Sequence, residues 1–93
     1  MKIKLYSVRD IVSKCYKAPF TAVVQGEAIR SFITAVDNPQ TQLHQFPNDF
    51  ELHEIGIWDD ETGVFETTDP VCIARAWEYV KRKENNEVLH DKE

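Results

Sequence analysis

Apolar and polar side chains alternate at the start of the chain. Ile3 and Leu5 are predicted to lie on one side of an extended backbone, and Lys2, Lys4 and Tyr6 on the other, because successive side chains of a β-strand project to opposite faces. The pattern predicts a first strand with one apolar face and one face that is basic and aromatic.

A second strand and a helix follow. Residues 15–21 are predicted to form a strand, and Pro19 places it at an edge or ends it there, because proline cannot donate a backbone hydrogen bond. From Glu27 the period changes to that of an amphipathic helix, whose apolar stripe consists of Ile29, Phe32, Ile33 and Val36. The segment Asp37-Asn38-Pro39 ends this helix.

A loop over residues 38–49 separates the helix from the next strand. The loop is long for a small domain, so we expect Leu43 and Phe46 to anchor it to the core. Residues 50–58 are rich in apolar and aromatic side chains and predict a strand in which Gly56 marks a bulge.

A hairpin and a second helix complete the predicted order. Residues 59–63 have the composition of a turn, with Gly63 able to adopt positive φ, and residues 64–67 return as a strand. Asp69 is predicted to cap a helix that has Pro70 at its first position and the core stripe Ile73, Ala76, Trp77 and Val80. The basic run 81–83 suits the end of that helix, and residues 84–93 are expected to form a frayed, charged tail.

These elements predict an α+β fold. The order ββαββα indicates an antiparallel sheet of about four strands with both helices on one face. We assign residues 1–83 to a single domain, since a chain of 93 residues is too short for two independent cores. An apolar content of 42% excludes a chain that is disordered throughout.

The sequence indicates a cytoplasmic protein. It contains no apolar run of membrane-spanning length and no secretory signal. Cys15 and Cys72 lack metal-binding spacing and are interpreted as reduced packing residues. Cys15 has lysine neighbours, but no histidine is placed by spacing to activate it as a nucleophile.

The net charge of −5 hides an uneven distribution. Residues 1–30 carry six basic and two acidic side chains, whereas residues 31–93 carry five basic and fourteen acidic ones. An anionic partner is therefore expected to contact the first part of the chain.

Candidate catalytic and metal-binding groups are few. The acidic run 59–61 lacks the spacing of a calcium loop and is interpreted as a solvated turn. His44 and His53 could form a metal site with Glu51 or Glu54, but no spacing fixes that geometry, and exposed histidines are the simpler interpretation. No phosphate-cradling or dinucleotide motif is present. The sequence thus predicts no enzyme, no cofactor and no metal.

The N-terminal strands combine cations with aromatic rings. Single-stranded nucleic acid is held by cations that contact phosphates and by rings that stack on bases. The predicted nucleic-acid-binding residues are Lys2, Lys4, Tyr6, Arg9, Lys14, Tyr16, Lys17, Phe20 and Arg30. The alternative is an ordinary solvated sheet face whose rings pack in the core or in a dimer.

Several further segments occur in order over residues 1–80. They are Lys2–Val8, Ala18-Pro19-Phe20-Thr21-Ala22, Ala28-Ile29-Arg30-x-Phe32, Ala35-Val36-x-Asn38-Pro39, Gln42-Leu43, Phe46-Pro47-x-Asp49-Phe50 and Ile55-Gly56-x-Trp58-Asp59-Asp60-x-Thr62-Gly63. In this combination the chain resembles the small non-structural protein of gokushovirus-type microviruses, which are tailless phages with circular single-stranded DNA genomes. That family often has Phe or Tyr at the position of Trp58, and the tail after Lys83 is particular to this chain.

The resemblance implies a DNA-binding protein, or one that assists the switch to single-stranded genome synthesis during replication and packaging. It adds no catalytic residues. We expect a protein of the infected bacterial cytoplasm, absent from the mature virion, that binds single-stranded DNA through its basic N-terminal strands. A homodimer is also expected, since the edge strand near Pro19 invites pairing. The alternative is an interaction module whose acidic surface binds the replication initiator, the procapsid or a host protein.

Overall fold

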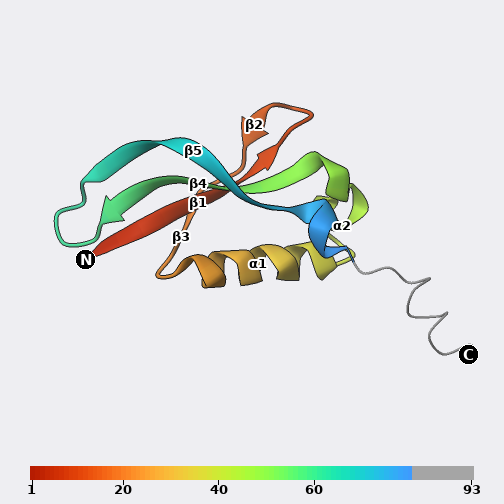
Figure 1. The fold of residues 1–93 in the computed structure, drawn as a ribbon, viewed down its shortest axis with the longest axis horizontal. Coiled ribbons are helices and arrows are strands. Elements are labelled where there is room, and N and C mark those ends of the chain that lie inside the picture. Colours follow the sequence, from red (N-terminus) through yellow and green to blue (C-terminus); the bar gives the residue numbers. More distant parts are fainter. Residues whose placement is uncertain (81–93) are drawn as a thin grey trace, which may run out of the picture.

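The computed structural model, which describes residues 1–80, contains one antiparallel sheet built around β1 (Lys2–Asp10). β4 (Phe50–Asp59) pairs with one edge of β1 along its whole length, and β5 (Phe65–Arg75) pairs with the other edge of β4. The short strands β2 (Cys15–Tyr16) and β3 (Phe20–Ala22) share the remaining edge of β1. These five strands form the layer seen in Figure 1.

The predicted α+β class and antiparallel sheet are confirmed, with five strands instead of about four. The additional strand arises because the predicted strand over residues 15–21 is broken into β2 and β3. Pro19 lies in the break, where a residue without an N–H takes no place in the ladder. The expected edge position of this segment is also confirmed.

The predicted amphipathic helix is confirmed as α1 (Gln25–Asp37), which covers one face of the sheet (Figure 1). Ala28, Phe32 and Val36 recur at every fourth position and are buried, as expected for the stripe of a helix that packs on a sheet. The helix ends at Asp37 and is capped by Asn38, whose N–H donates to the Ala35 carbonyl oxygen at 3.2 Å.

The segment after α1 contains a short helix, α2 (Gln42–Gln45), and a 3-10 turn, η1 (Pro47–Asp49). Leu43 is buried, so its predicted anchoring role is confirmed. The same prediction for Phe46 is wrong, because 55% of that residue is exposed. No helix formed by residues 1–80 has the length and hydrophobicity needed to cross a membrane.

The core lies between α1 and the half of the sheet that the helix covers. Its buried apolar residues are Tyr6, Ala28, Phe32, Val36, Leu43, Phe50, Leu52, Ala74 and Ala76. Figure 1 shows the start of β1 and the β4–β5 turn extending beyond the helix. Residues 60–71 are all exposed. We call residues 1–4 and 57–71 the arm.

The predicted helix from Asp69 to Val80 is wrong. Residues up to Arg75 belong to β5, and only a 3-10 turn, η2 (Ala76–Tyr79), is helical. The basic run 81–83 and the tail 84–93 lie outside the described residues. Within residues 1–80, α1 is therefore the only long helix, and the predicted ββαββα order is not reproduced.

Strand pairing explains why β5 overrides the local helical pattern. Without Val71 to Arg75, the backbone groups of β4 from Glu51 to Glu54 would lose their partners, at a cost in free energy for each buried unpaired group. Pro70 is accommodated because residues 68–70 fall between the paired positions Val71 and Thr67, where the register shifts. A proline at such a bulge breaks no ladder hydrogen bond.

The predicted β4–β5 turn and the bulge at Gly56 are confirmed. Gly63 has φ of 77°, and its N–H donates to the Asp59 carbonyl oxygen at 2.7 Å. The register of β4 shifts between Glu54 and Gly56. A Cβ atom at Gly56 would lie 3.0 Å from the backbone oxygen of Glu66, so this position leaves little room for a side chain.

Tyr6 is placed differently from its prediction. Its backbone does continue the alternation of β1, but its side chain is 0% exposed and belongs to the core. Within residues 1–80 its hydroxyl group has no hydrogen-bond partner. Burial raises the pKa of Tyr6. Lys2 and Lys4 remain exposed to solvent because they lie in the arm, beyond the helix.

Replacing Tyr6 by phenylalanine tests this burial. An unsatisfied buried polar group costs about 1–3 kcal/mol, so Tyr6→Phe is expected to raise the free energy of unfolding by about 1 kcal/mol. Equilibrium denaturation in urea measures the change. Tyr16→Phe is the matched control and is expected to give no gain, since the Tyr16 hydroxyl is hydrogen-bonded. A lower free energy of unfolding in Tyr6→Phe than in the wild type would contradict the conclusion that the buried Tyr6 hydroxyl lacks a hydrogen-bond partner.

Candidate nucleic-acid interface

The structure divides the predicted binding residues among four places. Lys2 and Lys4 lie in the arm, Tyr6 and Phe20 pack at the core, and Arg30 lies on α1. The remaining four residues come together at the opposite end of β1, around its connection to β2; they are Arg9, Lys14, Tyr16 and Lys17. We call these four residues the basic hairpin.

The two lysines of the arm are paired with acidic side chains. Lys2 Nζ lies 2.6 Å from Glu66 Oε2, and Lys4 Nζ lies 3.3 Å from Glu54 Oε1. The hydrogen bond with Glu66 raises the pKa of Lys2. Further carboxylates at residues 59–61 and 69 surround this end of the sheet. The arm is therefore unfavourable for a polyanion, contrary to the prediction for its lysines.

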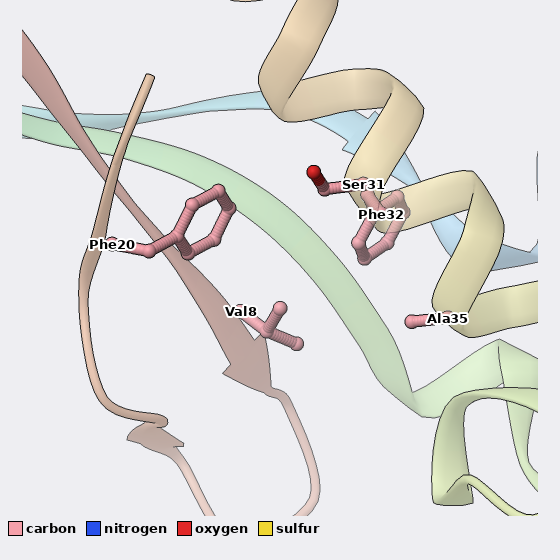
Figure 2. Close-up of a pocket in the computed structure, with 5 residues that line it drawn as sticks. All are labelled: Val8, Phe20, Ser31, Phe32 and Ala35. Atoms are coloured by element: carbon pink, nitrogen blue, oxygen red, sulfur yellow. The ribbon is translucent and has the colours of Figure 1, made fainter.

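Phe20 points inward from β3. Its ring centroid lies 5.9 Å from that of Tyr6. Figure 2 shows the Phe20 ring directed into the space between the sheet and α1. There it lines a pocket of about 170 Å³ together with Val8, Ser31, Phe32 and Ala35. Tyr6 is thus buried in the core, so its ring is not available for stacking on bases as predicted, and Phe20 is partly buried against the core and faces this pocket.

Arg30 is separated from the basic hairpin by the thickness of the domain. It stands two positions after buried Ala28 and two before buried Phe32. At 3.6 residues per turn, this places Arg30 on the face of α1 directed away from the sheet. It is exposed, but one phosphate group cannot contact both Arg30 and the β1–β2 connection.

A tight turn holds the tip of the basic hairpin. Asp10 Oδ1 accepts hydrogen bonds from the backbone N–H groups of Val12 and Ser13 at 3.0 and 3.2 Å. These bonds lower the pKa of Asp10. Lys14 follows with φ of 63°, and its N–H donates to the Asp10 carbonyl oxygen at 2.8 Å. The side chain of Lys14 is therefore presented at an exposed tip.

Tyr16 is the aromatic centre of this group. The guanidinium carbon of Arg9 lies 4.9 Å from the Tyr16 ring centroid, which is within the range of a cation–π contact. Tyr16 keeps 37% of its surface exposed. Lys17 is exposed, with Nζ 5.5 Å from the Phe50 ring centroid. Within residues 1–80, neither lysine of the hairpin nor Arg9 forms an ion pair with a carboxylate.

Two further polar side chains, His53 and Arg75, lie beside the basic hairpin and are not among the predicted nucleic-acid-binding residues. The Tyr16 hydroxyl and His53 Nδ1 are 2.9 Å apart, and His53 Nε2 lies 2.8 Å from Glu51 Oε1. Arg75 Nε is 3.9 Å from Glu51 Oε2. Strand pairing brings Arg9, Glu51 and Arg75 into one row. No local pattern indicated this row, because Arg75 was assigned to a helix.

The antiparallel sheet and its covering helix define an α+β protein. The comparison with known families identifies it as a phage protein. Residues 3–79 match the family described as "Phage ORF5 protein", and the chain belongs to that family. The matched region includes nearly all of the described residues and both ends of the sheet. No curated protein and no solved structure matches the chain. The expected phage origin is confirmed.

The turn at Asp10 makes a prediction for pH. Because hydrogen bonds lower the pKa of Asp10 in the folded protein, its ionised form contributes stability above the ordinary Asp pKa of about 3.9. That contribution is lost as the pH falls through the lower folded value. An NMR titration of the Val12 and Ser13 amides is expected to show a midpoint below about 3.9. An unshifted midpoint, or identical amide shifts in Asp10→Ala, would contradict the capping role.

Proposed function

We propose that this protein acts in replication of the single-stranded DNA genome of a gokushovirus-type phage, in the cytoplasm of the infected bacterium, by binding single-stranded DNA through the basic hairpin. The observation that carries the proposal is the contact of Arg9 with the exposed ring of Tyr16. Lys14 and Lys17 are exposed and flank β2 in the sequence, and within residues 1–80 none of these three cations forms an ion pair with a carboxylate. The resemblance described above supports the same function.

Each side chain has a distinct role in this proposal. Lys14 and Lys17 contact backbone phosphates, for which flexible ammonium groups are suited. Tyr16 stacks on a base, a contact that is worth about 1–3 kcal/mol and does not depend on sequence. Arg9 lies against the Tyr16 ring and holds it in place while adding positive charge.

The uneven charge of the domain orients the DNA. The basic hairpin and the acidic arm lie at opposite ends of β1, which runs from Lys2 to Asp10. A DNA strand is attracted to the first and repelled by the second, so binding is local despite the net charge of −5. With two or three phosphate contacts, the log–log dependence of affinity on salt should have a slope of about −1.5 to −2.

Fluorescence anisotropy of a labelled single-stranded oligonucleotide tests the proposal at two salt concentrations. Lys17→Glu is expected to raise the Kd about tenfold and to reduce the salt slope by about 0.7, because one phosphate contact is lost. Lys4→Glu is the matched control, with the same change of charge in the arm. Equal loss in both variants, or no binding by the wild type at low salt, would refute the basic hairpin as the site.

Two substitutions at Tyr16 test stacking separately from charge. Tyr16→Phe keeps the ring and should leave the Kd within about twofold, whereas Tyr16→Ala should weaken binding about tenfold. A duplex of equal length is expected to bind more weakly than the single strand, since its bases are not available for stacking. Equal affinities for Tyr16→Phe and Tyr16→Ala would exclude a stacking role.

The arm supports a second function, contact with another protein. Phe65 is 64% exposed, and Val64 and Val71 are each 56% exposed. Phe65 and Val71 belong to β5 and Val64 directly precedes it; the outer edge of β5 pairs with no other strand among residues 1–80. An exposed strand edge with apolar side chains is a template for pairing with a second chain. A homodimer formed there would leave two basic hairpins free for DNA.

Sedimentation velocity tests the arm as an interface. The wild type is expected to sediment as a dimer and Phe65→Glu as a monomer, because a buried carboxylate is strongly unfavourable in an apolar contact. Phe46→Glu is the matched control, since Phe46 is 55% exposed in the segment after α1, and it should remain dimeric. A monomeric wild type at all concentrations would exclude the dimer and leave the acidic surface for the replication initiator, the procapsid or a host protein.

A further inference from the structure

Three different metal-binding side chains meet on the face of the sheet opposite α1. Glu51 and His53 flank buried Leu52 in β4, so both point away from the core that Leu52 faces. Cys72 of β5 is the direct pairing partner of His53. A carboxylate, an imidazole and a thiol are thereby placed side by side by two adjacent strands.

The three donor groups are close enough to share one ion. One ligand atom of each residue lies within 4.8 Å of the other two. Tetrahedral zinc, with bonds of about 2.0–2.3 Å, separates its ligand atoms by about 3.3–3.8 Å. His53 Nε2 and Glu51 Oε1 are 2.8 Å apart, which is closer than two ligands of one ion, so the two side chains must separate slightly when the ion binds.

The surroundings of His53 fix it in a coordinating orientation. Its Nδ1 is 2.9 Å from the Tyr16 hydroxyl, which leaves Nε2 directed at Glu51. Metal-binding histidines usually have their second ring nitrogen held by a hydrogen bond in this way. The side chains of His53 and Glu51 are only 13% and 19% exposed. The position is thus partly shielded, which distinguishes it from an exposed acidic cluster.

We propose that Glu51, His53 and Cys72 bind one Zn²⁺ ion, with a fourth position open to solvent. A site with nitrogen, oxygen and sulfur ligands favours zinc over magnesium or calcium, which prefer oxygen alone. The sulfur–zinc bond forms as the thiol of Cys72 releases its proton to solvent. The proton by which His53 Nε2 is hydrogen-bonded to Glu51 moves to Nδ1, which then donates to the Tyr16 hydroxyl oxygen and leaves the Nε2 lone pair for the ion. The ionised ligands of the site, a thiolate and a carboxylate, then balance the two charges of the ion.

Arg75 is the main competitor for Glu51. Its Nε lies 3.9 Å from Glu51 Oε2, while its Nη1 lies 3.8 Å from Glu78 Oε2. Both contacts are long and the side chain is 45% exposed, so Arg75 can pair with Glu78 when Glu51 binds the ion. The zinc then links β4, through Glu51 and His53, to β5, through Cys72. The site lies beside the basic hairpin, because the Tyr16 hydroxyl is hydrogen-bonded to His53.

Titration of the reduced, untagged full chain with Co²⁺ tests the site, because cobalt replaces zinc and reports its ligands by absorption. The expected result is one bound equivalent with a thiolate-to-cobalt charge-transfer band in the near ultraviolet and the strong visible bands of tetrahedral coordination, both abolished by added Zn²⁺. Cys72→Ser should lose the thiolate band. His53→Gln should weaken affinity at least about tenfold, and Tyr16→Phe about tenfold.

Matched controls separate this site from accidental binding. Cys15→Ser and His44→Gln should each keep the charge-transfer band and the affinity. Zn²⁺ should raise the thermal midpoint of the wild type and of these controls but not that of Cys72→Ser, with folding of each variant checked by circular dichroism. No thiolate band at excess Co²⁺, or a band lost in Cys15→Ser and retained in Cys72→Ser, would overturn the proposal.

Discussion

β4 pairs with β1 from Phe50 to Asp59, and every other strand is attached to this pair. β4 has ten residues, and their backbone N–H and C=O groups require hydrogen-bond partners on both edges of the strand wherever they are buried. This requirement draws the chain from Phe65 to Arg75 into β5, although part of that segment has the spacing of a helix. It also leaves only one long helix among residues 1–80 to cover the sheet, and α1 reaches just one half of it (Figure 1).

The partial cover by α1 separates the two surfaces to which the proposed functions are assigned. Under the helix, alternate residues of β1 such as Tyr6 and Val8 pack in or against the core. Beyond it, Lys2 and Lys4 continue the same face into solvent, where they pair with glutamates. The arm is therefore acidic and apolar, which suits contact with protein, and the free cations gather at the other end of β1. The two proposed functions need not compete for one surface.

Tyr16 connects the proposed DNA contact with the proposed zinc site. Its ring lies against Arg9 and its hydroxyl group is bonded to His53. The two proposals use different parts of the side chain, the ring for stacking and the hydroxyl for orienting the imidazole. The two proposals can therefore be tested separately with Tyr16→Phe, which removes the hydroxyl group and keeps the ring. A bound ion behind the hairpin would restrict Tyr16 and lower the entropy lost when a base stacks on it.

The sequence by itself determined the first strand, α1, the β4–β5 turn and the edge position of the segment around Pro19, because each depends on local periodicity or backbone chemistry. Tertiary structure decided the rest. Tyr6 shares the alternation of the exposed residues Lys2 and Lys4 in β1, and its side chain is buried only because α1 covers its position. Cys72 meets His53 only because β4 needs a partner. Burial and strand pairing act between residues far apart in the chain, so no local pattern could assign the binding face or the three-ligand cluster.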